Sequence, residues 1–158
     1  MFTIEVKGLN ELVAGFKLVE KGVLDFRQLG AWKAVRTEFY KIMKEQFSSE
    51  GSAGRSGRWK SLSPKYKAIK DRKYGVLPIL QRTKRTYQSL TRQGADTVVE
   101  EDAQAMSVGT KVPYAKYHQE TRPIISLTDA QEKQLMKPIQ TKLKQLVANA
   151  RLKELRGF

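Results

Sequence analysis

Residues 54–90 read G-R-S-G-R-W-K-S-L-S-P-K-Y-K-A-I-K-D-R-K-Y-G-V-L-P-I-L-Q-R-T-K-R-T-Y-Q-S-L. This stretch opens as a loop of glycine, serine and arginine and continues into a short basic helix. Ser63 is a good N-cap, and Pro64 suits the first helical turn because a proline there gives up no hydrogen bond. Gly75 is expected to end the helix, and the apolar run 76–80 is expected to be extended.

The chain around this stretch is long enough for one domain with a core of its own. Its 158 residues are 40% hydrophobic, and a chain of this length buries roughly two thirds of its unfolded surface. We therefore expect a single domain over residues 1–158. No window reaches the run of about eighteen apolar residues that spans a membrane, and the first residues do not have the pattern of a signal peptide. A soluble protein without membrane contacts is expected.

Cysteine and histidine usage limits the chemistry. The chain has no cysteine and one histidine, His118. The absence of cysteine excludes disulfides and thiolate metal sites and fits a reducing compartment. One histidine argues against a histidine-cluster metal site. We therefore expect no metal site and no cofactor.

The charge is concentrated in one third of the chain. The whole sequence carries 30 lysines and arginines against 16 aspartates and glutamates, a net charge of +14. Residues 51–93 alone hold 12 basic residues and one acid, Asp71. Such a density of cations attracts polyanions or acidic protein surfaces. A solvated face that only confers solubility is an alternative that fits the sequence equally well.

Apolar periodicity predicts the elements before the basic stretch. Residues 2–6 alternate apolar and polar, as in a half-buried strand, and residues 9–23 have the pattern of an amphipathic helix. A second and stronger helix is expected from Leu29 to Phe47, with Gly51 as its stop signal. The apolar stripe of this helix is expected to face the sheet.

Three short segments after the basic stretch are expected to form an antiparallel meander. They are residues 86–92, 97–101 and 105–109. The turns between them are residues 94–96 and 102–104, which contain glycine and aspartate, residues that are common in hairpin turns. The first segment is ambiguous, because residues 82–90 could equally begin as a helical turn.

A closing helix is expected over residues 128–155. Thr128 and Gln131 form a capping box at its start, and Pro138 is expected to kink or divide it. The fold class is therefore α+β: a small antiparallel sheet of about four strands, packed by two or three helices, with a long basic glycine-rich loop.

The sequence contains no convincing catalytic constellation. The glycine-containing loop 51–63 lacks the P-loop pattern, so a flexible basic contact arm is preferred over a phosphate site. His118 could act as a general base, but it has no evident nucleophile or second titratable partner, and a structural hydrogen-bonding role is preferred. We expect no catalytic residue and no enzyme.

Short motifs along the chain occur in an order typical of one family. They are Gly57-Arg58-Trp59, Leu62-Ser63, Ile79-Leu80 with Thr83, Leu90, Val108-Gly109-Thr110, Pro113-Tyr114-Ala115, His118-Gln119 and Arg122-Pro123. In this order and spacing, over residues 25–140, they resemble the phage virion morphogenesis family, the Mu-like G protein and tail-completion group, which is related to head-tail neck proteins. The chain departs from the usual family pattern at Lys84, at Glu120-Thr121 and at Ile124.

The resemblance implies a structural protein of the head-tail junction of a bacteriophage, acting as a neck, tail-completion or tail-terminator protein without catalysis. Such proteins work as rings of identical copies, commonly hexamers, and contact neck or connector proteins and the tail tube or sheath. The implied location is the virion, after assembly in the host cytoplasm. Packaged DNA in the channel is a further implied contact.

This hypothesis assigns the contacts to particular residues. Trp59 is the expected anchor on a neighbouring subunit or on an acidic neck or tail surface. The steering charges beside it are Arg55, Arg58 and Lys60. A second interface is expected over Tyr114, His118, Gln119 and Arg122. Contacts with channel DNA or an acidic partner are expected from Lys65, Lys67, Lys70, Arg72, Lys73, Arg82, Lys84 and Arg85.

A stand-alone nucleic-acid-binding protein is the alternative from another functional class. It would use the same basic stretch, with Trp59, Tyr66, Tyr74 and Tyr87 as stacking groups. Its affinity for duplex DNA would depend steeply on salt, with a slope of about −0.9 per phosphate neutralised. A nuclease is the least favoured option, because the basic region lacks the acids and histidines that hold a metal.

Overall fold

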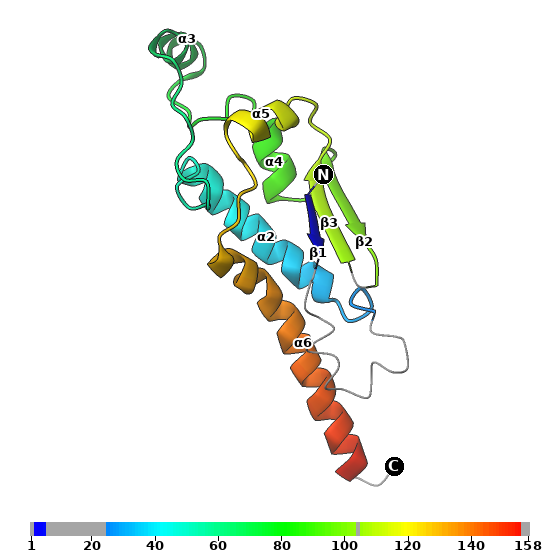
Figure 1. The fold of residues 1–158 in the computed structure, drawn as a ribbon. Helices are drawn as coiled ribbons and strands as arrows, with labels where there is room; N and C mark the ends of the chain where they lie inside the picture. The colour runs from blue at the N-terminus through cyan, green and yellow to red at the C-terminus, as the bar shows by residue number, and fades with distance from the viewer. Residues whose placement is uncertain (1, 6–24, 104, 156–158) are drawn as a thin grey trace.

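The computed structural model describes residues 2–5, 25–103 and 105–155, which form an α+β fold with an antiparallel sheet (Figure 1). The helices are α2 (Ala31–Ser48), α3 (Pro64–Tyr74), α4 (Arg85–Thr91), α5 (Ala115–Thr121) and α6 (Asp129–Leu155). The strands are β1 (Phe2–Glu5), β2 (Thr97–Glu101) and β3 (Ala105–Thr110). The helix expected over residues 9–23 lies outside the described residues.

β3 is the central strand of the sheet. It pairs antiparallel with β1 on one side and with β2 on the other, and Val108 lies opposite Phe2 and Val99. Met106 and Val108 are fully buried, because alternate residues of a strand face the same side and this side covers the core. The strand expected from the alternation of residues 2–6 is confirmed over residues 2–5, and the hairpin of β2 and β3 is confirmed as well.

The strand expected over residues 86–92 is wrong, because this segment is helix α4. The described part of the sheet therefore has three strands and not four. The side chains of Thr86, Ser89 and Leu90 are buried at helical spacing. The Ser89 hydroxyl donates to the carbonyl of Thr86 (2.9 Å) and the Thr91 hydroxyl to that of Tyr87 (2.8 Å), which satisfies both hydroxyls within the helix. So short a segment does not distinguish a strand from a helix by periodicity alone.

The expected helices on either side of the basic stretch are present. The buried side of α2 supplies the aromatic centre of the core, including Trp32, Phe39 and Phe47. α6 packs along α2 and runs through Pro138 without a break. Its capping box is confirmed: the Gln131 N–H donates to the Thr128 hydroxyl (3.3 Å), and the Thr128 N–H donates to Gln131 Oε1 (2.9 Å).

The glycine-containing loop, expected to be a flexible arm, folds as turns over the end of α2. The Gly51 N–H donates to the carbonyl of Gln46 (2.9 Å), and the Gly54 N–H to that of Gly51 (3.0 Å). The Arg55 N–H donates to the carbonyl of Ser126 (3.1 Å), which joins the loop to the segment before α6. Gly51 has a φ of 91°, and a β-carbon there would collide with the Trp59 ring. Only glycine permits both features.

Trp59 belongs to the core of its own chain. Its side chain is 3% exposed, and its ring packs edge-on against Phe47 with 5.4 Å between the centroids. The indole N–H donates to the carbonyl of Pro123 (2.8 Å), and the backbone N–H donates to that of Glu50 (2.7 Å). The expectation that Trp59 anchors on a neighbouring subunit is therefore wrong, since the ring is not accessible.

Replacing Trp59 by alanine is expected to lower the free energy of unfolding by about 3–5 kcal/mol, the usual cost of emptying a buried aromatic site. Urea denaturation followed by circular dichroism measures this change. The matched control is Tyr74→Ala, which removes a ring that is 42% exposed and should change the stability by about 0.5 kcal/mol or less. Equal stability of the two variants would contradict the buried position of Trp59.

Candidate functional site

Residues 60–82 form a projection that we call the basic arm. They run out from the end of the loop to α3 and return to the start of α4, so that α3 lies at the tip, away from the sheet and α6 (Figure 1). Lys70 is the buried residue of this helix. The rest of α3 is therefore open to contact.

The ends of α3 follow the local signals in the sequence. Ser63 is its N-cap, and the serine hydroxyl accepts a hydrogen bond from the Tyr66 N–H (3.4 Å). Gly75 is its C-cap with a φ of 79°, a conformation that favours glycine. Arg72 and Lys73 lie in the last turn, where cations interact favourably with the helix dipole. The predicted start and end of this helix are confirmed.

Glu50 fastens both stems of the basic arm to the end of α2. Its Oε1 accepts a hydrogen bond from the Ile79 N–H (3.0 Å), on the returning stem. Its Oε2 pairs with Arg58 (3.3 Å), just before the outgoing stem. On the returning stem, the amide of Gln81 donates to the carbonyl of Phe47 (3.3 Å). The arm is therefore anchored at its base by hydrogen bonds to the body.

The cations of residues 55–85 fall into three groups. Four form ion pairs within the chain: Arg55 with Asp129, Arg58 with Glu50, Lys67 with Asp71 and Arg85 with Asp96. The ammonium of Lys70 donates to the carbonyls of Leu77 and Pro78, which ties α3 to the returning stem. The others have no acidic partner among the residues that the structure describes: Lys60, Lys65, Arg72, Lys73, Arg82 and Lys84.

Exposed apolar side chains gather on the basic arm as well. Of the six large apolar residues that are exposed in the described part of the chain, four lie here: Tyr66, Ile69, Tyr74 and Val76. The Tyr74 ring has Lys73 and Arg82 over it, each 5.5 Å from its centroid. Exposed apolar groups beside charges that lack partners are typical of contact surfaces.

A cleft of about 530 Å³, which we call the arm cleft, lies between the basic arm and α5. One wall is a face of α3, with residues three and four apart: Ser63, Tyr66 and Lys70. The other wall is a face of α5 and its caps, with residues four apart: Tyr114, His118 and Arg122. The remaining lining residues are Leu62, Leu80, Arg82 and Thr83. No carboxylate of the described residues lines this cleft.

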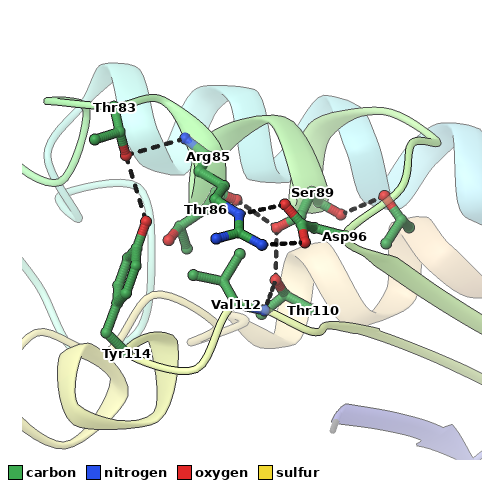
Figure 2. A network of polar contacts seen from close by, with 9 residues as sticks. Thr83, Arg85, Thr86, Ser89, Asp96, Thr110, Val112 and Tyr114 are labelled. Atoms are coloured by element: carbon green, nitrogen blue, oxygen red, sulfur yellow. Dashed lines mark hydrogen bonds and ion pairs between the residues drawn. The ribbon is translucent and has the colours of Figure 1, made fainter.

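A network of polar contacts extends from the start of α4 to the wall residue Tyr114 (Figure 2). The Thr83 hydroxyl lies 3.3 Å from the Tyr114 hydroxyl. Arg85 forms a two-point ion pair with Asp96 (2.5 and 2.7 Å), and this hydrogen bonding lowers the pKa of the Asp96 carboxyl. The network fixes α4 to the start of β2 and places Thr83 beside Tyr114.

Deeper in the same network, hydroxyl groups join α4 to the end of β3 (Figure 2). The Ser89 and Thr110 hydroxyls are hydrogen-bonded to each other (2.7 Å), and the Thr110 oxygen accepts a hydrogen bond from the Val112 N–H (3.1 Å). Val112 is two residues before Tyr114, so these bonds set the path of the chain into α5.

The predicted interface residues of α5 have different roles. Gln119 Oε1 accepts from the N–H groups of Ile124 (2.9 Å) and Ile125 (3.0 Å), so Gln119 makes the expected bonds to nearby backbone. Arg122 donates to the carbonyl of Lys60 (2.8 Å), on the outgoing stem of the arm. The His118 ring instead contacts the Tyr114 ring edge-on, with centroids 5.7 Å apart. The backbone hydrogen bond expected from the His118 side chain is not made among the described residues.

Sequence reasoning missed α5 and the arm cleft. The spacing of Tyr114, His118 and Arg122 was the available signal, because residues four apart share a helix face. No group of three histidine, aspartate or glutamate side chains within the described ranges could hold a metal ion. None of the helices in these ranges is long and apolar enough to cross a membrane. The arrangement is suited to binding through charge and apolar contact.

Comparisons of the chain with protein families, with characterised proteins and with solved structures found no match. Its function must therefore be inferred from the geometry of the basic arm and from the sequence motifs.

The stability of the protein is expected to depend on the protonation of His118. Burial, and to a smaller extent Arg122, lowers the pKa of His118 from its ordinary value of 6.5. The unfolded chain therefore takes up this proton first, so the contribution of His118 is complete above pH 6.5 and is lost as the pH falls towards the lowered pKa. Melting temperatures between pH 7.5 and pH 5 should fall, and less so for His118→Gln.

The lowered pKa values of carboxyl groups do not interfere with this measurement. The pKa values of Glu38 and Asp96 are lowered by their hydrogen-bonding partners from ordinary values of 4.5 and 3.8, so their contributions are lost only at more acid pH. A His118→Gln variant with the pH dependence of the wild type would contradict the assignment.

Proposed function

We propose that this protein is a structural assembly protein of the bacteriophage head-tail junction, and that it contacts its partner through the basic arm. The observation that carries this proposal is the arm itself, because a helix held away from the body buries little of its own surface. It presents cations that have no acidic partner in the part of the chain that the structure describes, and they lie beside exposed apolar side chains. Such a surface is stabilised when a partner with acidic and apolar groups covers it.

The motifs that resemble the virion morphogenesis family support this setting, because several of them contribute residues at the base of the arm or in the arm cleft. Trp59 lies in the core at the base of the outgoing stem. Further motif residues come from separate parts of the sequence to line the arm cleft: Leu62, Ser63, Leu80, Thr83, Tyr114, His118 and Arg122. These motif residues lie far apart in the sequence but line one cleft, so they can form a single contact surface.

Ring formation by identical copies is part of the proposal. β1 and β2 are the outer strands of the described sheet, and outer strands present unpaired backbone groups to which another chain can bind. The ring, commonly a hexamer in the resembled group, would contact neck or connector proteins and the tail tube or sheath.

Nucleic-acid binding is the second candidate function. The Tyr74 ring, with Lys73 and Arg82 over it, is the observation that favours it, because exposed rings with adjacent cations stack on bases. For each phosphate neutralised, the affinity for duplex DNA would then fall by about 0.9 logarithmic units for every tenfold increase in salt concentration. A junction protein is expected to bind DNA weakly and without preference for sequence.

Particle joining tests the proposed function. In a phage whose copy of this gene is switched off, electron micrographs should show DNA-filled heads beside free tails, or tails of abnormal length. Wild-type protein supplied in trans should restore joined particles, whereas Ile69→Asp with Tyr74→Ala should not, because both residues are exposed on the arm. Circular dichroism establishes that the variant is folded.

The matched control is Tyr117→Ala, which removes an exposed ring outside the arm and should restore joining fully. Restoration by the arm variant would contradict the role of the arm. Normal virions in normal numbers without the gene would contradict the head-tail function itself.

A further inference from the structure

Two hollows flank the basic arm, and they differ in charge. One, of about 410 Å³, is lined by Glu50 and Asp71 as well as by cations, and these acids pair with Arg58 (3.3 Å) and Lys67 (2.5 Å). The other is the arm cleft, whose charged lining residues are Lys70, Arg82, Arg122 and no acid. The positive charge of the arm cleft is therefore not compensated by the described residues.

The arm cleft combines this charge with apolar surface. Leu62 and Leu80 are partly buried against the hydrophobic core and line the cleft. Tyr66 and Tyr114, on opposite walls, are 43% and 37% exposed. The volume of about 530 Å³ lies within the usual range of binding pockets, roughly 300–1,000 Å³. A ligand with both anionic and apolar groups fits such a lining.

The cations of the cleft are held in position by the fold. Arg122 donates to the carbonyl of Lys60 (2.8 Å), and Lys70 donates to the carbonyls of Leu77 and Pro78. Charges that are fixed before binding lose less side-chain entropy when a ligand arrives. Arg82 is exposed and makes no hydrogen bond within the described residues, so it is the residue available for direct contact.

This arrangement favours a peptide over a nucleic acid. A phosphate backbone carries one charge per nucleotide and is bound by a continuous row of available cations. Two of the three cations here already donate to carbonyls, and the leucines offer no partner for phosphate. Carboxylates on either side of an apolar side chain match the lining better.

We propose that the arm cleft binds an acidic segment of a partner protein, with its carboxylates facing Arg82, Lys70 and Arg122 and an apolar side chain against Leu62 and Leu80. This rests on the proposed function for the identity of the partner as a neighbouring virion protein, and it adds the chemistry that this protein presents. The two tyrosines flank the apolar side chain on the two walls.

The test uses the full chain and a fluorescein-labelled peptide in which glutamates flank one phenylalanine. Fluorescence anisotropy gives its affinity, beside that of the same peptide with glutamines and of a single-stranded DNA oligonucleotide of equal charge. Arg82→Glu should weaken binding of the acidic peptide by about tenfold or more, because it replaces an attractive contact by a repulsive one. Arg72→Glu makes the same charge change on the arm outside both hollows and should weaken binding by about threefold or less.

A second variant keeps the test valid if Arg82→Glu is unstable. Thr83→Glu introduces a carboxylate into the cleft from an exposed position and should produce a similar loss, while circular dichroism checks folding. Equal losses for Arg82→Glu and Arg72→Glu would overturn the proposal, since binding would then reflect only the overall positive charge.

Two further results would also overturn it. One is binding of the glutamine peptide as tight as that of the glutamate peptide. The other is binding of the oligonucleotide that is tighter than binding of the acidic peptide and that is lost in the Arg82→Glu variant. This result would assign the cleft to a nucleic acid. Because the peptide is measured on purified protein, this test and the particle-joining test can fail independently of each other.

Discussion

The buried indole of Trp59 is the contact on which the position of the basic arm depends. Its ring packs against Phe47 near the end of α2, and its N–H binds the carbonyl of Pro123 on the segment that leads to α6. Its backbone binds Glu50, which in turn holds the returning stem through Ile79. The end of α2, the segment before α6 and the returning stem are therefore all connected to Trp59, one residue before the arm begins. Core packing thus holds the α3 wall of the arm cleft opposite its α5 wall.

The same region separates two uses of positive charge. Some cations pair with acids of the chain and contribute to its structure, as Arg58 does with Glu50 and Lys67 with Asp71. Others, such as Arg72 and Lys73 in the last turn of α3, have no acidic partner among the described residues. Surface ion pairs are weak contributors to stability, so the fold does not depend on partners for these cations, and the proposed function assigns them to contacts with an acidic partner.

The sequence predicted what local rules determine. Helix caps such as Ser63, Gly75 and the capping box at Thr128 depend on neighbouring residues and were recognised from the sequence. The segment 86–92 was not, because its burial against β3 decides its conformation and its short pattern does not. Trp59 beside a glycine-containing loop suggested an anchor on a neighbouring subunit or partner surface, whereas its burial within its own chain depends on space left by Gly51. The arm cleft joins residues 62–83 to residues 114–122, a contact between distant segments that periodicity cannot reveal.

In the proposed assembly, the basic arm contacts an acidic protein surface in the particle. Photo-crosslinking from p-benzoylphenylalanine in place of Tyr74, in cells that assemble particles, identifies what the arm contacts. The same group in place of Lys44, an exposed residue of α2, is the control. We predict that position 74 crosslinks to an acidic segment of a neighbouring virion protein and that position 44 does not. Crosslinks from position 74 to nucleic acid alone, or the same products from both positions, would contradict the account.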